Sequence, residues 1–229
     1  SENSVSTGSG LASSASGFAA YVLALNSLYG WEMDHKHLGI LARTGSGSAC
    51  RSILSGFVVW HKGTREDGMD SYATGMSQTW SDLRIGMLEI STQRKPLGST
   101  QAMLHSAATS PLYDEWVTLN DEYLHEVRNA IRQKDLRSLV DLAQKNALFM
   151  HEVIRASDPL DNGSKLDYFL ERTREELDKV NELRSHGMIL GATMDAGPQV
   201  KLIFHKDDIQ AIADHFPNVR IIEPYFGGA

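Results

Sequence analysis

The sequence is poor in cysteine, with a single residue, Cys50, among 229. One thiol excludes an internal disulfide framework and fits a reducing compartment. Long apolar runs are also missing, since each is interrupted well short of the about 18 residues that a membrane-spanning helix requires. No charged and then apolar leader opens the sequence, so we expect no export signal, no membrane partner and a cytoplasmic location.

Positive charge is scarce, because 22 Lys and Arg residues stand against 29 Asp and Glu and give a net charge of -7. A general nucleic-acid-binding protein presents a basic face, so we expect no nucleic acid as a partner. Any anionic ligand must be held by local donors or by a metal ion, against an unfavourable overall field. Hydrophobic residues make up 41% and charged residues 22%, which is typical of an ordinary globular protein.

Several common motifs are absent. The sequence has no Walker loop with GKS or GKT, and a GxGxxG pattern fails because Ser13 takes the last glycine position. No GxSxG elbow occurs, which argues against a serine hydrolase. An HExxH pattern begins at His151 but has Arg155 in place of the second histidine, which argues against a zinc protease.

Small hydroxyl residues and glycines are abundant in GSGLASSASG, residues 8–17, directly before the apolar run 18–25. At a helix start the first amides lack internal partners and the helix dipole is positive, while glycines let a ligand come close. Serine hydroxyls add donors or can ligate a metal that a phosphate carries. These features describe a phosphate cradle, and the alternative is a Gly/Ser linker or a simple N-cap. The abrupt change to an apolar helix favours the cradle.

Two further stretches carry candidate chemistry. GSGSACRS, residues 45–52, repeats the glycine and serine pattern and adds Arg51, whose fork can grip a carboxylate or phosphate. Alone it fits a helix-starting turn with a surface arginine slightly better, but two such turns favour an anion site. Asp195 follows the apolar run 188–194 and precedes Ala-Gly-Pro, which suits a catalytic carboxylate at a strand end and an ordinary turn equally well.

The periodicity of apolar residues predicts an α+β protein. Helices are expected over 11–28, 35–43, 99–185 and 207–215, the third with breaks near Ser110-Pro111, Lys134-Asp135 and 158–164. Strands are expected over 56–62, 83–91, 188–194, 200–205 and 219–223. The change in character near 92–98 predicts two domains, 1–92 and 93–229.

A series of motifs, in this order, resembles the diphosphomevalonate decarboxylases of the GHMP kinase superfamily: GLASSASG (10–17), ARTGSGSACRS (42–52), GFVVW (56–60), DSYA (70–73), STQAM (99–103) and MDAGP (194–198). The resemblance implies a GHMP two-domain fold, with an incomplete N-terminal domain here and a C-terminal α/β sandwich of ferredoxin-like character. Family chains begin well upstream, so we hypothesise that this chain is the larger part of a longer or nicked protein. Its implied partners are the missing N-terminal segment and a second copy in a homodimer.

The same resemblance implies ATP-dependent decarboxylation of 5-diphosphomevalonate to isopentenyl diphosphate, with ATP and Mg2+ as cofactors. It places Asp195 and Arg51 as catalytic residues, Asp195 facing the 3-hydroxyl and Arg51 holding the substrate carboxylate. It assigns the ATP phosphates to Gly10, Leu11, Ala12, Ser13, Ser14, Ser16 and Gly17, with Ser13 and Ser14 also near the metal. It assigns the substrate to Ser46, Gly47, Ser48, Arg51 and Ser99.

Four alternatives remain open from the sequence. A phosphomevalonate decarboxylase would share the fold and the Asp195 and Arg51 pair but act on the monophosphate. A 3-kinase that phosphorylates without decarboxylation would not need both Asp195 and Arg51. A non-catalytic nucleotide-binding module would bind without releasing carbon dioxide. A Gly/Ser linker joined to an unrelated helical domain would leave the ordered motifs unexplained.

Overall fold

The computed structural model describes residues 13–93, 95 and 97–224, and these form two compact units that are each described by themselves. The first unit ends at Thr79 and the second runs from Trp80 to Pro224. The strand expected over 83–91 is present as β3 (Leu83–Leu88), and it belongs to the second unit because it pairs with strand β5 (Val200–His205). The domain boundary expected after residue 92 stays a prediction.

The N-terminal unit combines three helices with a two-stranded antiparallel sheet. Its elements are α1 (Ser13–Tyr29), α2 (His35–Gly45), α3 (Ala49–Ser52), β1 (Val58–Trp60) and β2 (Ala73–Gly75). The apolar face expected for the first helix is confirmed, since Ala15, Ala19 and Val22 are buried against α2 and α3. The expected end of this helix near residue 28 is confirmed too, because α1 ends at Tyr29 and the next residue, Gly30, has a φ of 59°, which suits glycine.

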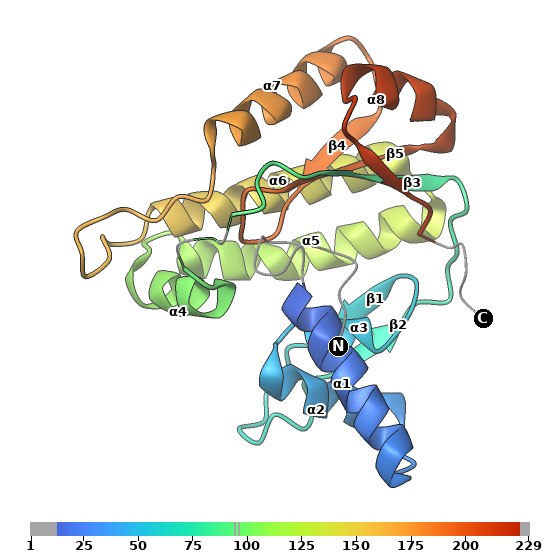
Figure 1. Cartoon of the computed structure of the whole chain (residues 1–229), viewed down its shortest axis with the longest axis vertical. Helices are drawn as coiled ribbons and strands as arrows, with labels where there is room; N and C mark the ends of the chain where they lie inside the picture. The colour runs from blue at the N-terminus through green and yellow to red at the C-terminus, as the bar shows by residue number, and fades with distance from the viewer. Residues whose placement is uncertain (1–12, 94, 96, 225–229) are drawn as a thin grey trace. The chain divides into compact units, whose positions relative to one another are not determined.

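The C-terminal unit is built on a four-stranded antiparallel sheet in the order β4-β5-β3-β6. Figure 1 shows α7 and α8 on one side of this sheet and α5 and α6 on the other. None of the described helices is both long and apolar enough to cross a membrane. Besides β3 and β5, the elements are α4 (Ser99–Thr109), α5 (Tyr113–Gln133), α6 (Leu136–Arg155), α7 (Glu171–Ser185), β4 (Leu190–Thr193), η1 (Lys206–Asp208), α8 (Ile209–His215) and β6 (Arg220–Ile222).

The core of this unit follows from the alternation along β5. Val200, Leu202 and Phe204 are fully buried, whereas the residues between them are only partly buried. They pack with Leu177 and Val180 of α7 in one apolar cluster. A strand of period two has therefore placed one face against the helices, and the expected α+β class is confirmed.

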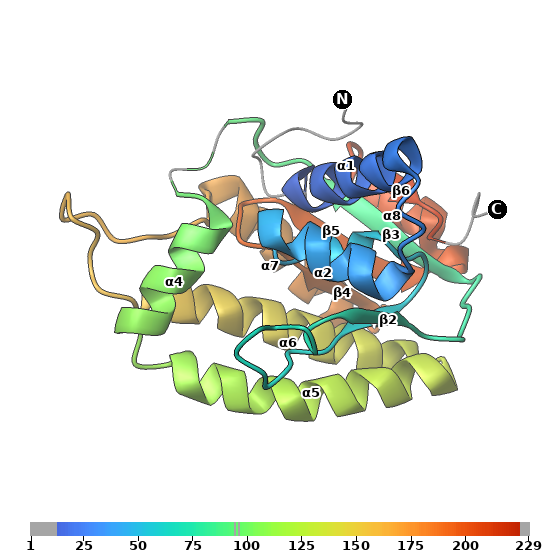
Figure 2. The ribbon, with the colours of Figure 1, turned by 90° about the horizontal axis from the view of Figure 1, so that it is seen from below.

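The helical hairpin of α5 and α6 has a local cause. Lys134 adopts the left-handed conformation with a φ of 54° and ends α5. Asp135 then caps α6, because its carboxylate accepts a hydrogen bond from the Ser138 amide at 3.1 Å. The expected break at Lys134-Asp135 is confirmed, and the two helices return side by side (Figure 2).

Helix α6 packs so closely against Gly191 of β4 that no side chain fits at this position. A Cβ at this position would lie 2.5 Å from Val140 Cβ and 2.7 Å from the Val140 carbonyl oxygen. We expect Gly191→Ala to lower the free energy of unfolding by about 2 kcal/mol, because helix and strand must separate. Urea unfolding measures the loss. Gly163→Ala is no control, since its φ of 78° is strained, so Gly98→Ala, where no atom lies closer than 4.0 Å, serves instead.

Candidate functional site

The two glycine and serine segments meet in the N-terminal unit. Helix α1 begins at Ser13, and no acidic residue occupies its first turn to offset the positive helix end. The hydroxyl of Ser14 lies 3.2 Å from the hydroxyl of Ser46, which directly follows α2. The hydroxyl-rich turn that contains Ser46 therefore lies beside the start of α1. Gly10, Leu11 and Ala12 lie outside the described residues.

The other residues of the first segment contribute unequally. Ser13 is buried with 8% of its surface exposed. The Ser16 hydroxyl donates to the Ser13 carbonyl at 3.1 Å, so its proton is used within the helix. At Gly17 an added Cβ would meet no atom within 4 Å, so protein packing does not require glycine there. Among the described members of this segment, Ser14 is therefore the hydroxyl best placed for a ligand.

The ring of Trp60 packs against the second glycine and serine segment, residues 45–52. The Arg51 guanidinium is exposed on α3 and lies 5.9 Å from the centre of the Trp60 ring. A Cβ at Gly47 would lie 3.3 Å from this ring, so glycine lets the turn approach it closely. Within the described residues Arg51 forms no ion pair, and Ser48 at the start of α3 makes no capping hydrogen bond with its side chain. The turn thus presents an unpaired cation with hydroxyls beside it.

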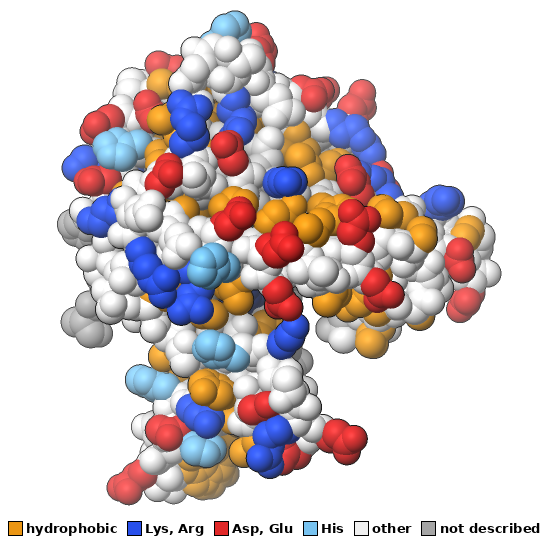
Figure 3. All heavy atoms as spheres, turned by 180° about the vertical axis from the view of Figure 1, so that it is seen from behind, with side chains coloured by type: hydrophobic (Ala, Val, Ile, Leu, Met, Phe, Trp, Pro, Cys, Tyr) orange, Lys and Arg blue, Asp and Glu red, His pale blue; other side chains and the backbone are white. Residues whose placement is uncertain are grey.

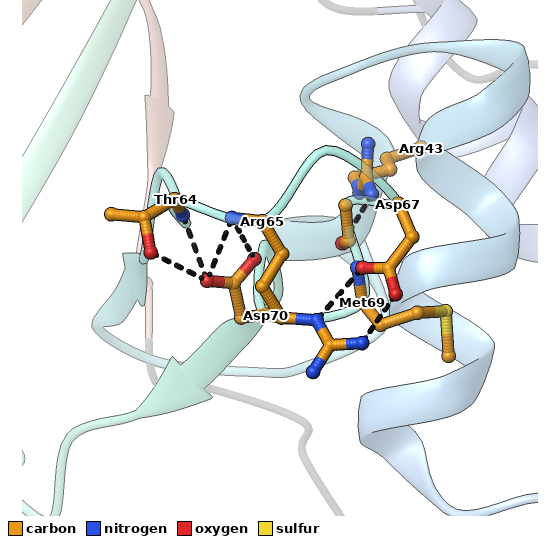
Figure 4. Close-up of polar contacts among 7 residues, drawn as sticks. Arg43, Thr64, Arg65, Asp67, Met69 and Asp70 are labelled. Atoms are coloured by element: carbon orange, nitrogen blue, oxygen red, sulfur yellow. Dashed lines mark hydrogen bonds and ion pairs between the residues drawn. The ribbon is translucent and has the colours of Figure 1, made fainter.

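Polar contacts hold the loop between β1 and β2 in place, and Figure 4 draws several of them. Asp70 accepts hydrogen bonds from the Thr64 amide at 2.8 Å and the Thr64 hydroxyl at 3.2 Å, and these bonds keep the Asp70 pKa below its ordinary value. Arg43 of α2 donates to the carbonyls of Gly68 at 2.6 Å and Ser71 at 2.9 Å. The Ser71 hydroxyl then accepts from the Trp60 indole at 3.1 Å. The Asp70-Ser71 motif therefore serves to hold Trp60.

In the C-terminal unit a second group of polar residues surrounds the turn between β4 and β5. The Asp195 side chain is half exposed and forms an ion pair with the Lys201 ammonium. Lys95 donates to the Ser99 hydroxyl at 2.6 Å and to the Ala196 carbonyl at 2.7 Å. Burial lowers the Lys95 pKa, and the nearby Asp195 charge opposes this shift. Two lysines thus lie beside the one carboxylate that the sequence singled out.

The site residues expected from the sequence therefore fall into two groups. Ser14, Ser46 and Arg51 lie in the N-terminal unit, and Ser99 and Asp195 lie in the C-terminal unit. Within each unit the structure brings the members together. The meeting of Asp195 with Arg51 across the units stays a prediction, as do the ligands assigned to each residue.

Two family models match the chain. The diphosphomevalonate decarboxylase-like N-terminal domain matches residues 1–73, and the mevalonate 5-diphosphate decarboxylase C-terminal domain matches residues 87–224. The second match alone covers more than half of the chain. The chain belongs to the diphosphomevalonate decarboxylase family.

Full-length members of this family are longer than the chain. It is 33% identical to the diphosphomevalonate decarboxylase of Candida albicans, over 96% of this chain and 61% of that protein. It is 35% identical to the enzyme of Bos taurus, over 95% of this chain and 54% of that protein. The chain thus spans little more than half the length of these curated relatives.

Solved structures of decarboxylases share the fold. The mevalonate diphosphate decarboxylase of Enterococcus faecalis matches with a TM-score of 0.83 at 32% identity, over 95% of this chain and 66% of that chain. A complex of MDDEF with MVAPP, AMPPCP and magnesium matches with a TM-score of 0.84 at 31% identity, over 96% of this chain and 70% of that chain. The expected GHMP-type decarboxylase fold is confirmed.

Several residues of these two polar groups were not predicted from the sequence. Lys95 and Lys201 belong to no motif that the sequence analysis recognised. The alternation along β5 places Lys201 on the face opposite to its buried neighbours. No ligand-facing role was predicted for Trp60, and Gly47 in the turn before Arg51 was the local signal of a close aromatic plane. His151 was examined as a zinc ligand, whereas it bonds the Asp195 carbonyl. Contacts between residues this far apart in sequence leave no periodic trace.

Proposed function

We propose that the protein carrying this chain catalyses the ATP-dependent decarboxylation of 5-diphosphomevalonate to isopentenyl diphosphate. One observation carries the proposal: the hydroxyls of Ser14 and Ser46 lie 3.2 Å apart, and the segment of Ser46 also bears Arg51, which forms no ion pair with any described residue. A helix start with no acidic residue in its first turn and an accessible guanidinium suit two anionic ligands at once. Membership of the decarboxylase family supplies the reaction that uses two such ligands.

The start of α1 would hold the ATP phosphates through its amides and the Ser14 hydroxyl. The described residues contain no group of three or more His, Cys, Asp and Glu side chains that could hold a metal alone. Magnesium would therefore arrive with the phosphates, and the exposed Ser14 hydroxyl fits it as a supplementary oxygen ligand, while the same role for the buried Ser13 stays a prediction. When bound, the ion neutralises charge on the phosphoryl group being transferred.

Asp195 would accept the proton of the substrate 3-hydroxyl while that oxygen takes the γ-phosphoryl group and ADP is released. Phosphate then leaves carbon 3 with the electrons of the C–O bond. The electrons of the bond to the carboxylate form the new double bond, and carbon dioxide departs. Arg51 would hold the carboxylate in line until that bond breaks, because its planar fork matches a carboxylate in two places.

Local donors must carry this binding, because the chain has a net charge of -7. On the face drawn in Figure 3, acidic and basic side chains of the described residues are interspersed and do not form a field of one sign. This face therefore steers an anionic substrate only weakly. The exposed guanidinium of Arg51 and the two lysines beside Asp195 are the charges on which we expect anion binding to depend.

The test is an assay of the full-length protein that carries this chain, with ATP and magnesium, on 5-diphosphomevalonate and on the monophosphate. Equal yields of carbon dioxide and ADP from the diphosphate support the proposal. Faster turnover of the monophosphate identifies a phosphomevalonate decarboxylase. ADP without carbon dioxide identifies a 3-kinase, and binding without turnover identifies a non-catalytic module.

Arg51→Lys should separate holding the carboxylate from general charge. We expect carbon dioxide release to fall about thirtyfold, because an ammonium keeps the charge but cannot bond both carboxylate oxygens in one plane. Steady-state kinetics with 5-diphosphomevalonate measure the effect. Arg132→Lys, at an exposed position of α5, is the matched control and should leave the rate unchanged. Equal rates for the two variants would remove Arg51 from the mechanism.

A further inference from the structure

The turn that carries Asp195 is held through its carbonyl oxygens. The Asp195 carbonyl lies 3.1 Å from His151 Nε2 of α6, and the Ala196 carbonyl accepts from Lys95 at 2.7 Å. The Pro198 carbonyl accepts from the Thr173 hydroxyl of α7 at 3.0 Å. Three side chains from separate segments thus fix a stretch that lies outside the strand ladder.

His151 is the support that touches Asp195 itself. A carbonyl oxygen only accepts hydrogen bonds, so Nε2 must carry the proton in this contact. In the neutral ring Nδ1 then carries a lone pair, and this buried atom has no hydrogen-bond partner among the residues that the structure describes. The ring is 1% exposed and packs at 4.6 Å from the Phe169 ring centre and 6.3 Å from that of Tyr168. Its enclosure leaves one hydrogen bond and one orientation.

The charges around His151 come from every segment that packs against it. Arg155 lies on the same helix, Asp167 precedes α7, and Asp195 belongs to the turn. Burial dominates over these charges and lowers the His151 pKa to about 4, with Tyr168 remaining protonated because burial raises its pKa to about 12. At neutral pH the imidazole is therefore a neutral donor with a fixed tautomer.

We propose that His151 is a positioning residue for Asp195, which sets the direction of the carboxylate by fixing the backbone carbonyl of the same residue. The inference rests on the proposed function, in which that carboxylate takes the proton of the 3-hydroxyl. With the carbonyl directed into the protein toward α6, the Asp195 side chain is left half exposed and paired with Lys201. Rotation of the peptide at Asp195 would turn the carboxylate away from the reacting hydroxyl.

Two substitutions separate this role from mere packing. His151→Gln keeps an amide donor at the place of Nε2, whereas His151→Leu removes the donor and keeps the volume. We expect the Leu variant to lower kcat about thirtyfold with KM for both substrates unchanged, and the Gln variant to restore most of the rate. Ser157→Ala is the control, because it removes a buried 2.9 Å bond to Ser106 at the end of the same helix and should leave kcat unchanged.

A second measurement does not need turnover. Nitrogen NMR of the full-length protein should show the Nε2-protonated tautomer of His151, and carbon NMR should report the hydrogen bond at the Asp195 backbone carbonyl through the chemical shift of that carbon. We expect this chemical shift to move in His151→Leu and to stay in place in Ser157→Ala. The Nδ1 tautomer, or an equal Asp195 carbonyl shift in all variants, would overturn the positioning role. Failure of carbon dioxide release in the unaltered protein would overturn the proposed function alone.

Discussion

Replacing Asp195 by asparagine is expected to lower carbon dioxide release about a thousandfold, because the amide keeps the shape but cannot take a proton. The substitution also leaves the Lys201 ammonium without its carboxylate partner, next to the hydroxyl that must lose its proton. An unpaired cation there stabilises the hydroxyl anion but provides no acceptor for the proton. Binding of the diphosphate should change little, so the loss should fall on kcat. Stopped assays of carbon dioxide and ADP on the same samples measure both halves of the reaction.

Asp82→Asn is the matched control for this experiment. Asp82 forms an ion pair with Lys206 at 2.6 Å in the same unit, with similar exposure, and the sequence gives it no role in the chemistry. Its loss should leave both product yields unchanged. If Asp195→Asn kept more than about a tenth of the rate, Asp195 could not be the proton acceptor. If ADP formation persisted while carbon dioxide release vanished, Asp195 would act after phosphoryl transfer.

The second large effect is a loss of stability in mild acid. In the folded chain the His151 pKa lies at about 4, whereas an unfolded histidine has its ordinary value of 6.5. Between these two values the unfolded state binds one more proton than the folded state, so stability falls as pH falls from about 6.5 to about 4. The full pKa difference corresponds to about 3 kcal/mol in the free energy of unfolding. Below a pH of about 4 His151 adds no further pH dependence.

Urea unfolding at several pH values between 7 and 4 measures this slope, and His151→Gln provides the comparison. The glutamine keeps the donor to the Asp195 carbonyl and does not titrate, so its stability should be nearly level over the same range. The carboxylates with lowered pKa, such as Asp70 and Asp135, lose their contribution only at lower pH. Parallel slopes in both proteins would show that His151 is neither buried nor neutral in solution.

The sequence predicted the helices and the core strands well because each repeats its own pattern. The apolar spacing of α1 and the alternation along β5 are local properties, and both are confirmed. Strand β2 was missed, because three residues carry no alternation and the strand exists only through its pairing with β1. The segment between α6 and α7 was expected to break the helical pattern, but the packing of its Leu166 and Tyr168 against Ala196, next to Asp195, could not be foreseen.

The candidate site shows the same division. Serines, glycines and Arg51 were visible because they cluster in the sequence, and the structure brings Ser14 and Ser46 together. Lys95 reaches the Ala196 carbonyl over about half of the chain, and His151 reaches the Asp195 carbonyl from the far end of a helix. Such contacts arise from tertiary packing, which no local pattern encodes. The homodimer, the missing N-terminal segment and the cytoplasmic location stay predictions.

Trp60 gives the proposed anion site a built-in optical reporter. Its indole lies under the Arg51 guanidinium and touches the turn at Gly47, while Ser71 keeps the ring in place. When a carboxylate binds the Arg51 guanidinium, the electric field on the Trp60 ring changes, and the fluorescence emission of Trp60 should change with it. Occupancy of the proposed anion site can thus be followed in the emission of Trp60, one of four tryptophans in the chain, without a label and without waiting for chemistry.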